Sequence, residues 1–187
     1  MSKYEEICQA SENAVRKWNQ YRDRSWDYLA TIVHGLITQC GVPEEKITFL
    51  RSNGLPGEER IYSLPEAGTG QFTLPGAVTY DKEDEYWHLG VAITLSRAGT
   101  FPERWVGIVL CVTENDGQAV VKLGIDGTPR PIDFNNPKQC TELYDEIVEY
   151  LKGLFENPRK ITRQIGFATV VNPQQGQKDE KPAAAER

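Results

Sequence analysis

The strongest constraint on the fold is an apolar alternation that runs through residues 86–126 of this 187-residue chain. The dipeptide Asp116-Gly117 separates two alternating segments and is typical of a two-residue hairpin turn. Folding the chain at this turn places apolar residues opposite one another in three pairs: Val112 with Val121, Leu110 with Leu123, and Ile108 with Ile125. These residues therefore predict one buried face of an antiparallel hairpin.

The preceding segment, residues 86–96, alternates with the same parity. A loop over residues 97–104 would let it pair with the next strand and place apolar residues together again: Leu95 near Val106, Ile93 near Ile108, and Val91 near Leu110. Three strands that agree on one parity fix which face is buried. We therefore expect Ile93, Ile108 and Ile125 to lie in one buried row.

Two segments have helical periodicity. Residues 3–40 contain no proline, and Gly41-Val42-Pro43 would end a helix there. The apolar stripe shifts near residues 22–27, so the sequence does not decide whether the helix is continuous or is bent or broken at that point. The second half is more apolar and is expected to cover the sheet. Residues 136–157 predict a second helix, with Asn136 as its cap.

The order of these segments predicts an α+β fold, with a long N-terminal helix, an antiparallel β-meander of about five or six strands, and a C-terminal helix packed on the sheet. Shorter β-type segments are expected at residues 46–52, 59–65, 70–80 and 161–170. Residues 1–170 are expected to form a single domain. Residues 171–187 have no apolar pattern and predict a disordered tail.

Charge and cysteine usage limit the function classes. The net charge of −6 and pI of about 5.1 disfavour general nucleic-acid binding. The sequence has no apolar segment long enough for a membrane span and no apolar N-terminal segment of the signal-peptide kind. Four cysteines at irregular spacing indicate reduced thiols in a cytoplasmic protein: Cys8, Cys40, Cys111 and Cys140.

The face of the strands opposite the predicted core is rich in small residues. Glycine within a strand weakens it and often marks close approach by another group. We therefore expect something apolar to approach this face, either a ligand, a second subunit or part of the long helix. The candidate binding residues are Trp105, His88, Gly90, Gly107, Gly124 and Lys122.

Three residues on the same face could carry chemistry. In the predicted register His88 is a diagonal neighbour of Cys111, and Lys122 lies beside Cys111, where its charge would favour a thiolate. A Cys–His nucleophile pair is therefore conceivable. Against it, Cys111 lies mid-strand, with no glycine loop or helix N-terminus beside it to form an oxyanion hole. A packed structural cysteine is the simpler interpretation.

The acidic residues before His88 could suggest a metal site: Asp81, Glu83, Asp84 and Glu85. Lys82 interrupts them, and the spacing is not that of a calcium loop. We therefore interpret residues 81–85 as a polar turn that leads into a strand, and we expect neither a metal nor a cofactor.

The first helix carries a basic cluster interleaved with Trp18, Tyr21 and Trp26, which is either a partner surface or a solvated face; its residues are Arg16, Lys17, Arg22 and Arg24. The sequence leaves two function classes. The first is a non-catalytic interaction or ligand-binding module of the chaperone-like, inhibitor or adaptor kind, whose partner is another protein or a second copy. The alternative is a hydrolase-type enzyme that uses the face of His88, Cys111 and Lys122.

Overall fold

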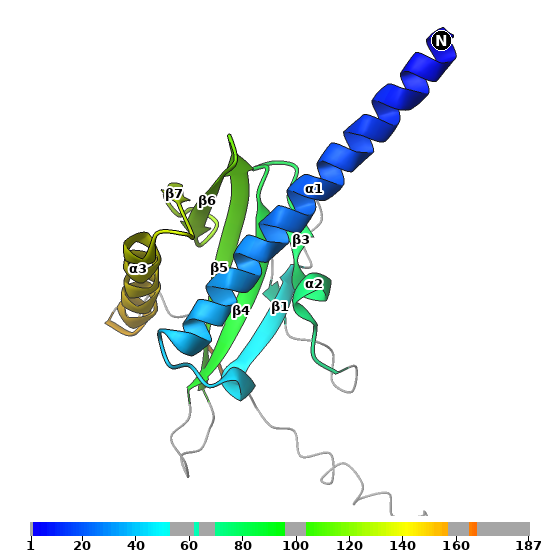
Figure 1. Ribbon diagram of the computed structural model, residues 1–187. Coiled ribbons are helices and arrows are strands. Elements are labelled where there is room, and N and C mark those ends of the chain that lie inside the picture. Colours follow the sequence, from blue (N-terminus) through cyan, green and yellow to red (C-terminus); the bar gives the residue numbers. More distant parts are fainter. Residues whose placement is uncertain (1, 53–61, 64–69, 96–103, 157–164, 168–187) are drawn as a thin grey trace, which may run out of the picture.

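The computed structural model describes residues 2–52, 62–63, 70–95, 104–156 and 165–167, and they form the predicted α+β fold (Figure 1). The helices are α1 (Lys3–Thr38), the 3-10 turn η1 (Glu44–Lys46), α2 (Leu74–Ala77) and α3 (Pro137–Glu156). The strands are β1 (Ile47–Ser52), β2 (Tyr62–Ser63), β3 (Thr79–Tyr80), β4 (Trp87–Leu95), β5 (Arg104–Asn115), β6 (Gln118–Leu123), β7 (Arg130–Ile132) and β8 (Ile165–Phe167).

All strand pairs are antiparallel, and the main path through the sheet is β2-β1-β4-β5-β6-β7. The hairpin at Asp116-Gly117 has the predicted register, with Leu110 opposite Leu123. Between β4 and β5 the predicted parity is right but the register is wrong by two residues, because Ile93 lies opposite Val106. Alternation repeats every two residues, so it fixes the buried face and leaves a two-residue shift open.

The predicted buried row holds for two of its three members. Ile93 and Ile108 are buried in the core, whereas Ile125 is exposed, so its placement there was wrong. Strand β6 ends at Leu123, and Gly124 has a φ of 81°, in the left-handed region that favours glycine. The chain therefore leaves the sheet before Ile125 can continue the alternation.

Helix α1 is continuous over 36 residues, without the bend or break that the sequence left open near residues 22–27. Its stripe passes through Ser25, which is fully buried and small enough to fit against the sheet. A capping box between Ser2 and Glu5 satisfies backbone donors at the N-terminus. Every buried residue of α1 lies between Ser25 and Leu36, so the second half of the helix covers the sheet, as predicted.

Both long helices contribute to one hydrophobic core with β4, β5 and β6. Helix α1 crosses one face of the sheet, and α3 lies beside the second half of α1 (Figure 1). The two helices meet at Gly35 and Tyr144, where a Cβ on Gly35 would lie 1.9 Å from the tyrosine ring. The Tyr144 hydroxyl donates to the Thr31 carbonyl oxygen at 3.1 Å, which ties α3 to α1.

The buried hydroxyl of Tyr144 makes stability sensitive to high pH. Burial first, and then the charges of Cys140 and Cys40, raises the pKa of Tyr144 to about 12. A raised folded-state pKa means that this contribution to stability is complete below about pH 10 and is lost as pH rises toward 12. We expect Tyr144→Phe to lose less stability than the parent chain between those values. Denaturant unfolding at pH 9 and 11 measures the difference, and parallel losses in the two proteins would contradict it.

Two short segments differ from expectation, and a third agrees with it. Residues 70–80 are not one strand but α2 followed by β3, because Thr73 caps a short helix with a proline in its first turn. Strand β7 was not predicted and lies at the sheet edge, where its Pro131 costs no hydrogen bond to a further strand. Within residues 161–170, β8 pairs with β5. The predicted tail, residues 171–187, lies outside the described residues.

No helix among the described segments is long and apolar enough to cross a membrane.

Candidate functional site

A partly buried polar cluster on the small-residue face joins side chains from β2, β4, β6 and the turn before β4, and His88 is its centre. The His88 ring is 1 % exposed, with Nδ1 2.8 Å from the Tyr62 hydroxyl and Nε2 3.0 Å from Asp84 Oδ2. An ionised Asp84 can only accept, so it places a proton on Nε2. In the neutral ring, Nδ1 then accepts from Tyr62. Lys122 Nζ completes the cluster by donating to Asp84 Oδ2 at 2.9 Å.

The acidic segment forms the predicted turn, but Asp84 within it belongs to the cluster, which the sequence interpretation missed. Glu85 has a φ of 61°, an unusual conformation for a residue other than glycine. The Asp84 carboxylate accepts from the Tyr86 backbone N–H at 3.1 Å and lies against His88 and Lys122. The sequence did offer one indication. His88 and Lys122 were predicted on the same face, and two basic groups that are buried together need a carboxylate beside them.

The charge of Asp84 is stabilised in place. Burial alone raises the pKa of this carboxyl, but the Lys122 hydrogen bond, the charge of His88 and the Tyr86 N–H together outweigh it and hold the pKa below its usual value. The Lys122 side chain is 9 % exposed, and its ammonium also lies 3.9 Å from the centre of the Tyr86 ring. The cluster is therefore built on a partly buried ion pair between Asp84 and Lys122.

One group of candidate metal ligands exists within the described residues: Asp81, Asp84 and His88, whose ligand atoms lie within 4.8 Å of one another. The ammonium of Lys122 already lies 2.9 Å from Asp84 and would repel a cation at that carboxylate. His88 Nε2 faces the same carboxylate with its proton. This arrangement is better suited to an internal ion pair than to a metal.

Cys111 lies directly between His88 and Lys122 in the sheet, so the predicted diagonal to His88 was wrong by the same two-residue shift. The thiol is fully buried and donates to the Gly124 carbonyl oxygen at 3.7 Å. Both ring nitrogens of His88 face oxygen atoms of Tyr62 and Asp84. The three candidate catalytic residues are adjacent, but neither nitrogen is directed at the thiol.

The glycines of this face have different reasons for being glycine. A Cβ on Gly90 would lie 2.7 Å from the Cβ of Leu50 and 2.9 Å from a ring carbon of Tyr62, so an apolar group does approach Gly90. At Gly124, glycine is favoured because the backbone has a positive φ. Gly107 lies opposite Ala92 on the neighbouring strand.

The predicted binding residues do not form one site. Trp105 is half-buried and pairs with Thr94 toward the far end of β4, whereas His88 is near its start. Tyr62 lies over Gly90 and hydrogen-bonds to His88. The face near His88 is therefore covered from within the chain.

A second candidate is the first half of α1, which extends past the sheet into solvent (Figure 1). Trp18 is the first residue of the helix to pack on the sheet, with its ring 4.8 Å from that of Tyr80. Before it, large apolar side chains are left exposed, with Tyr4 at 74 %, Ile7 at 67 % and Val15 at 57 %. We call Tyr4, Ile7, Val15 and the half-exposed Trp18 the free stripe.

The free stripe continues the buried face of the same helix. At about 100° per residue, the four side chains fall within an arc of about 80°. The α1 residues that pack into the core lie in nearly the same arc: Leu29, Ile32, Val33 and Leu36. The helix therefore presents one apolar side along its whole length, and only the second half of that side is covered by the described part of the chain.

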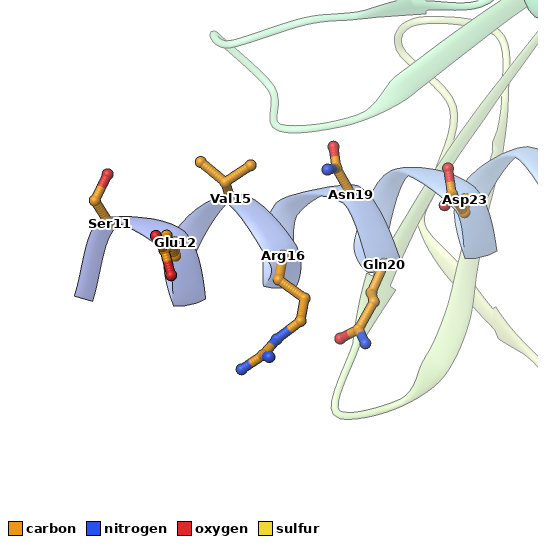
Figure 2. A pocket seen from close by; sticks show the side chains of 7 residues that line it. All are labelled: Ser11, Glu12, Val15, Arg16, Asn19, Gln20 and Asp23. Carbon is orange, nitrogen blue, oxygen red and sulfur yellow. The ribbon is translucent and has the colours of Figure 1, made fainter. Parts of the chain in front are cut away.

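A shallow hollow lies beside the free stripe, and Figure 2 shows the side chains that line it. All of its lining side chains come from α1: Ser11, Glu12, Val15, Arg16, Asn19, Gln20 and Asp23. A hollow lined by one helix cannot enclose a small molecule. Its shape is that of an open surface on which another chain could lie.

Comparison with known proteins found no match to this sequence among family models, curated proteins or solved structures.

Proposed function

We propose that this protein is a non-catalytic protein-interaction module whose docking element is the free half of α1, residues 3–18. One observation carries the proposal: the free stripe continues the side that α1 buries against the sheet, and none of the described segments covers it. Amphipathic helices of this kind recognise partners by placing their apolar side in a groove or on another helix.

Within the part of the chain that the structure describes, the free stripe does not contribute to the hydrophobic core. Tyr4, Ile7 and Val15 lie outside the hydrophobic core and its partly buried margin. Single exposed apolar side chains are ordinary on protein surfaces. Four in one arc of an unsupported helix are different, because such a helix is marginal in water and gains its stability from packing.

The hydrolase alternative has less support. Its nucleophile would be Cys111, which is fully buried, and its base would be His88, whose nitrogens face Tyr62 and Asp84. We interpret the cluster as a structural device that holds β2 and the acidic turn onto the sheet. The proposed setting is the cytoplasm, for which the four free thiols give support.

Photo-crosslinking in cells tests the docking role. A benzoylphenylalanine at Val15 should yield covalent adducts with a macromolecule, because this position lies in the free stripe. The control is the same residue at Glu149, which lies on the exposed side of α3. Adducts at Val15 and none at Glu149 are expected, and the absence of adducts at Val15, Ile7 and Tyr4 would contradict the proposal.

A further inference from the structure

We infer that the partner of the free stripe is a second copy of the same chain, bound antiparallel through residues 3–18 of α1. This inference rests on the proposed function and names its partner. The observation that favours a second copy is the way charge is distributed along the free half of the helix.

The two ends of this segment carry opposite charge. Residues 3–15 contain Lys3, Glu5, Glu6 and Glu12, a net charge of −2. Residues 16–18 contain Arg16 and Lys17, a net charge of +2. A parallel pair would place like charges together, whereas an antiparallel pair brings each acidic end beside the basic end of its partner.

At the basic end, some of the positive charges are not neutralised by the described part of the same chain. Arg22 pairs with Asp23, and Arg24 pairs with Glu114, so both are already neutralised within the chain. Among the described residues, neither Arg16 nor Lys17 forms an ion pair; the Arg16 guanidinium only donates to the side-chain oxygen of Asn13 at 2.6 Å.

The spacing of the free stripe suits a two-fold axis at Ser11. With Ser11 facing its own copy, Tyr4 lies opposite the partner's Trp18, and Ile7 lies opposite the partner's Val15. Along the helix axis, Glu5 and Glu6 of each copy then lie level with Lys17 and Arg16 of the other copy, on both sides of the two-fold axis. Ser11 belongs to the same arc as the stripe, and its small side chain lets the two helices approach closely.

Sedimentation equilibrium of the full chain tests the inference. The parent protein should show a reversible monomer–dimer equilibrium, and Val15→Glu should weaken it at least about tenfold by placing a charge in the apolar contact. At a concentration where the parent is monomeric, circular dichroism and the Tm of the two proteins should match, because Val15 lies outside the core. A parent protein that is monomeric at every concentration, or a dimer unaffected by Val15→Glu, would overturn the inference.

Disulfide trapping tests the orientation. In a Cys8→Ser background, Ser11→Cys should form a disulfide-linked dimer under mild oxidation. In the parent chain, Cys8 should not pair with its own copy, because an antiparallel pair offsets the two by about 9 Å along the axis, beyond the reach of a disulfide. A Cys8–Cys8 dimer would indicate a parallel pair and overturn the inference.

A charge exchange provides a matched control. Glu5→Lys/Glu6→Lys and Arg16→Glu/Lys17→Glu should each weaken self-association, and mixing the two variants should restore it. The chain that carries all four changes should not pair with the parent chain, because an antiparallel arrangement would then bring like charges together; pairing would overturn the orientation. A monomeric parent that still crosslinks through Val15 to another protein would refute the second copy and leave the docking role standing.

Discussion

Gly35→Ala is expected to lower the free energy of unfolding by about 2–3 kcal/mol, although alanine is the better helix former by about 1 kcal/mol. The added Cβ would lie 1.9 Å from the ring and hydroxyl of Tyr144, a distance that no packing tolerates. Tyr144 is 4 % exposed, and its hydroxyl bonds to Thr31 on α1. The ring must therefore give up that hydrogen bond, or the two helices must separate.

Chemical denaturation measures this effect, and Gly153→Ala is its matched control. Gly153 lies within α3 with open space around its would-be Cβ, so alanine there should stabilise by about 0.5–1 kcal/mol. In a Tyr144→Ala background, Gly35→Ala should lose most of its cost, because the obstacle is gone. A similar result for Gly35→Ala and Gly153→Ala would show that α1 and α3 do not pack as described.

The buried face of the sheet was predictable because its evidence is repeated along three strands. Ile93, Ile108 and Leu110 each lie on the side that alternation assigned to the core. The offset between β4 and β5 was not predictable, since a shift of two residues leaves every apolar side chain on the same face. That offset changed which residues meet, and it brought His88 directly opposite Cys111.

The continuity of α1 was obscured by the residue types at its centre. Read by polarity alone, Arg22 and Ser25 interrupt the apolar stripe and suggest a bend. In the structure Ser25 is buried, while the Arg22 guanidinium lies 5.2 Å from the centre of the Trp26 ring. A small polar residue can fill a core position when space is limited, and polarity does not reveal that limit.

The candidate site was predictable in part. Parity correctly grouped His88, Cys111 and Lys122, but two of the residues that bind His88 lie outside the three strands. Tyr62 comes from a two-residue strand, and Asp84 comes from a turn shaped by the positive φ of Glu85. Backbone conformation in turns and pairing between distant short strands leave little periodic trace in a sequence.

Lys122→Met is expected to lower the free energy of unfolding at neutral pH by about 2–4 kcal/mol, because removing one partner of a buried ion pair leaves the other charge uncompensated. This expected loss of stability is smaller than for a fully buried pair, because the Asp84 side chain is 26 % exposed and retains some hydration. Arg24→Met is the control: it breaks the ion pair to Glu114 at a site where Arg24 is 50 % exposed, and it should cost no more than about 1 kcal/mol.

The pH dependence of the same variant separates loss of the ion pair from loss of packing. Because the pKa of Asp84 is held below its usual value, the contribution of the pair is complete above about pH 4 and is lost as pH falls through the folded-state pKa. In Lys122→Met, the carboxyl keeps the burial that raises its pKa and loses its main hydrogen-bond donor. The destabilisation should therefore be largest at neutral pH and shrink as both proteins protonate Asp84. Urea unfolding at pH 7 and pH 3 measures it, and an equal cost at the two values would mean that Lys122 contributes through its aliphatic stem rather than through its charge.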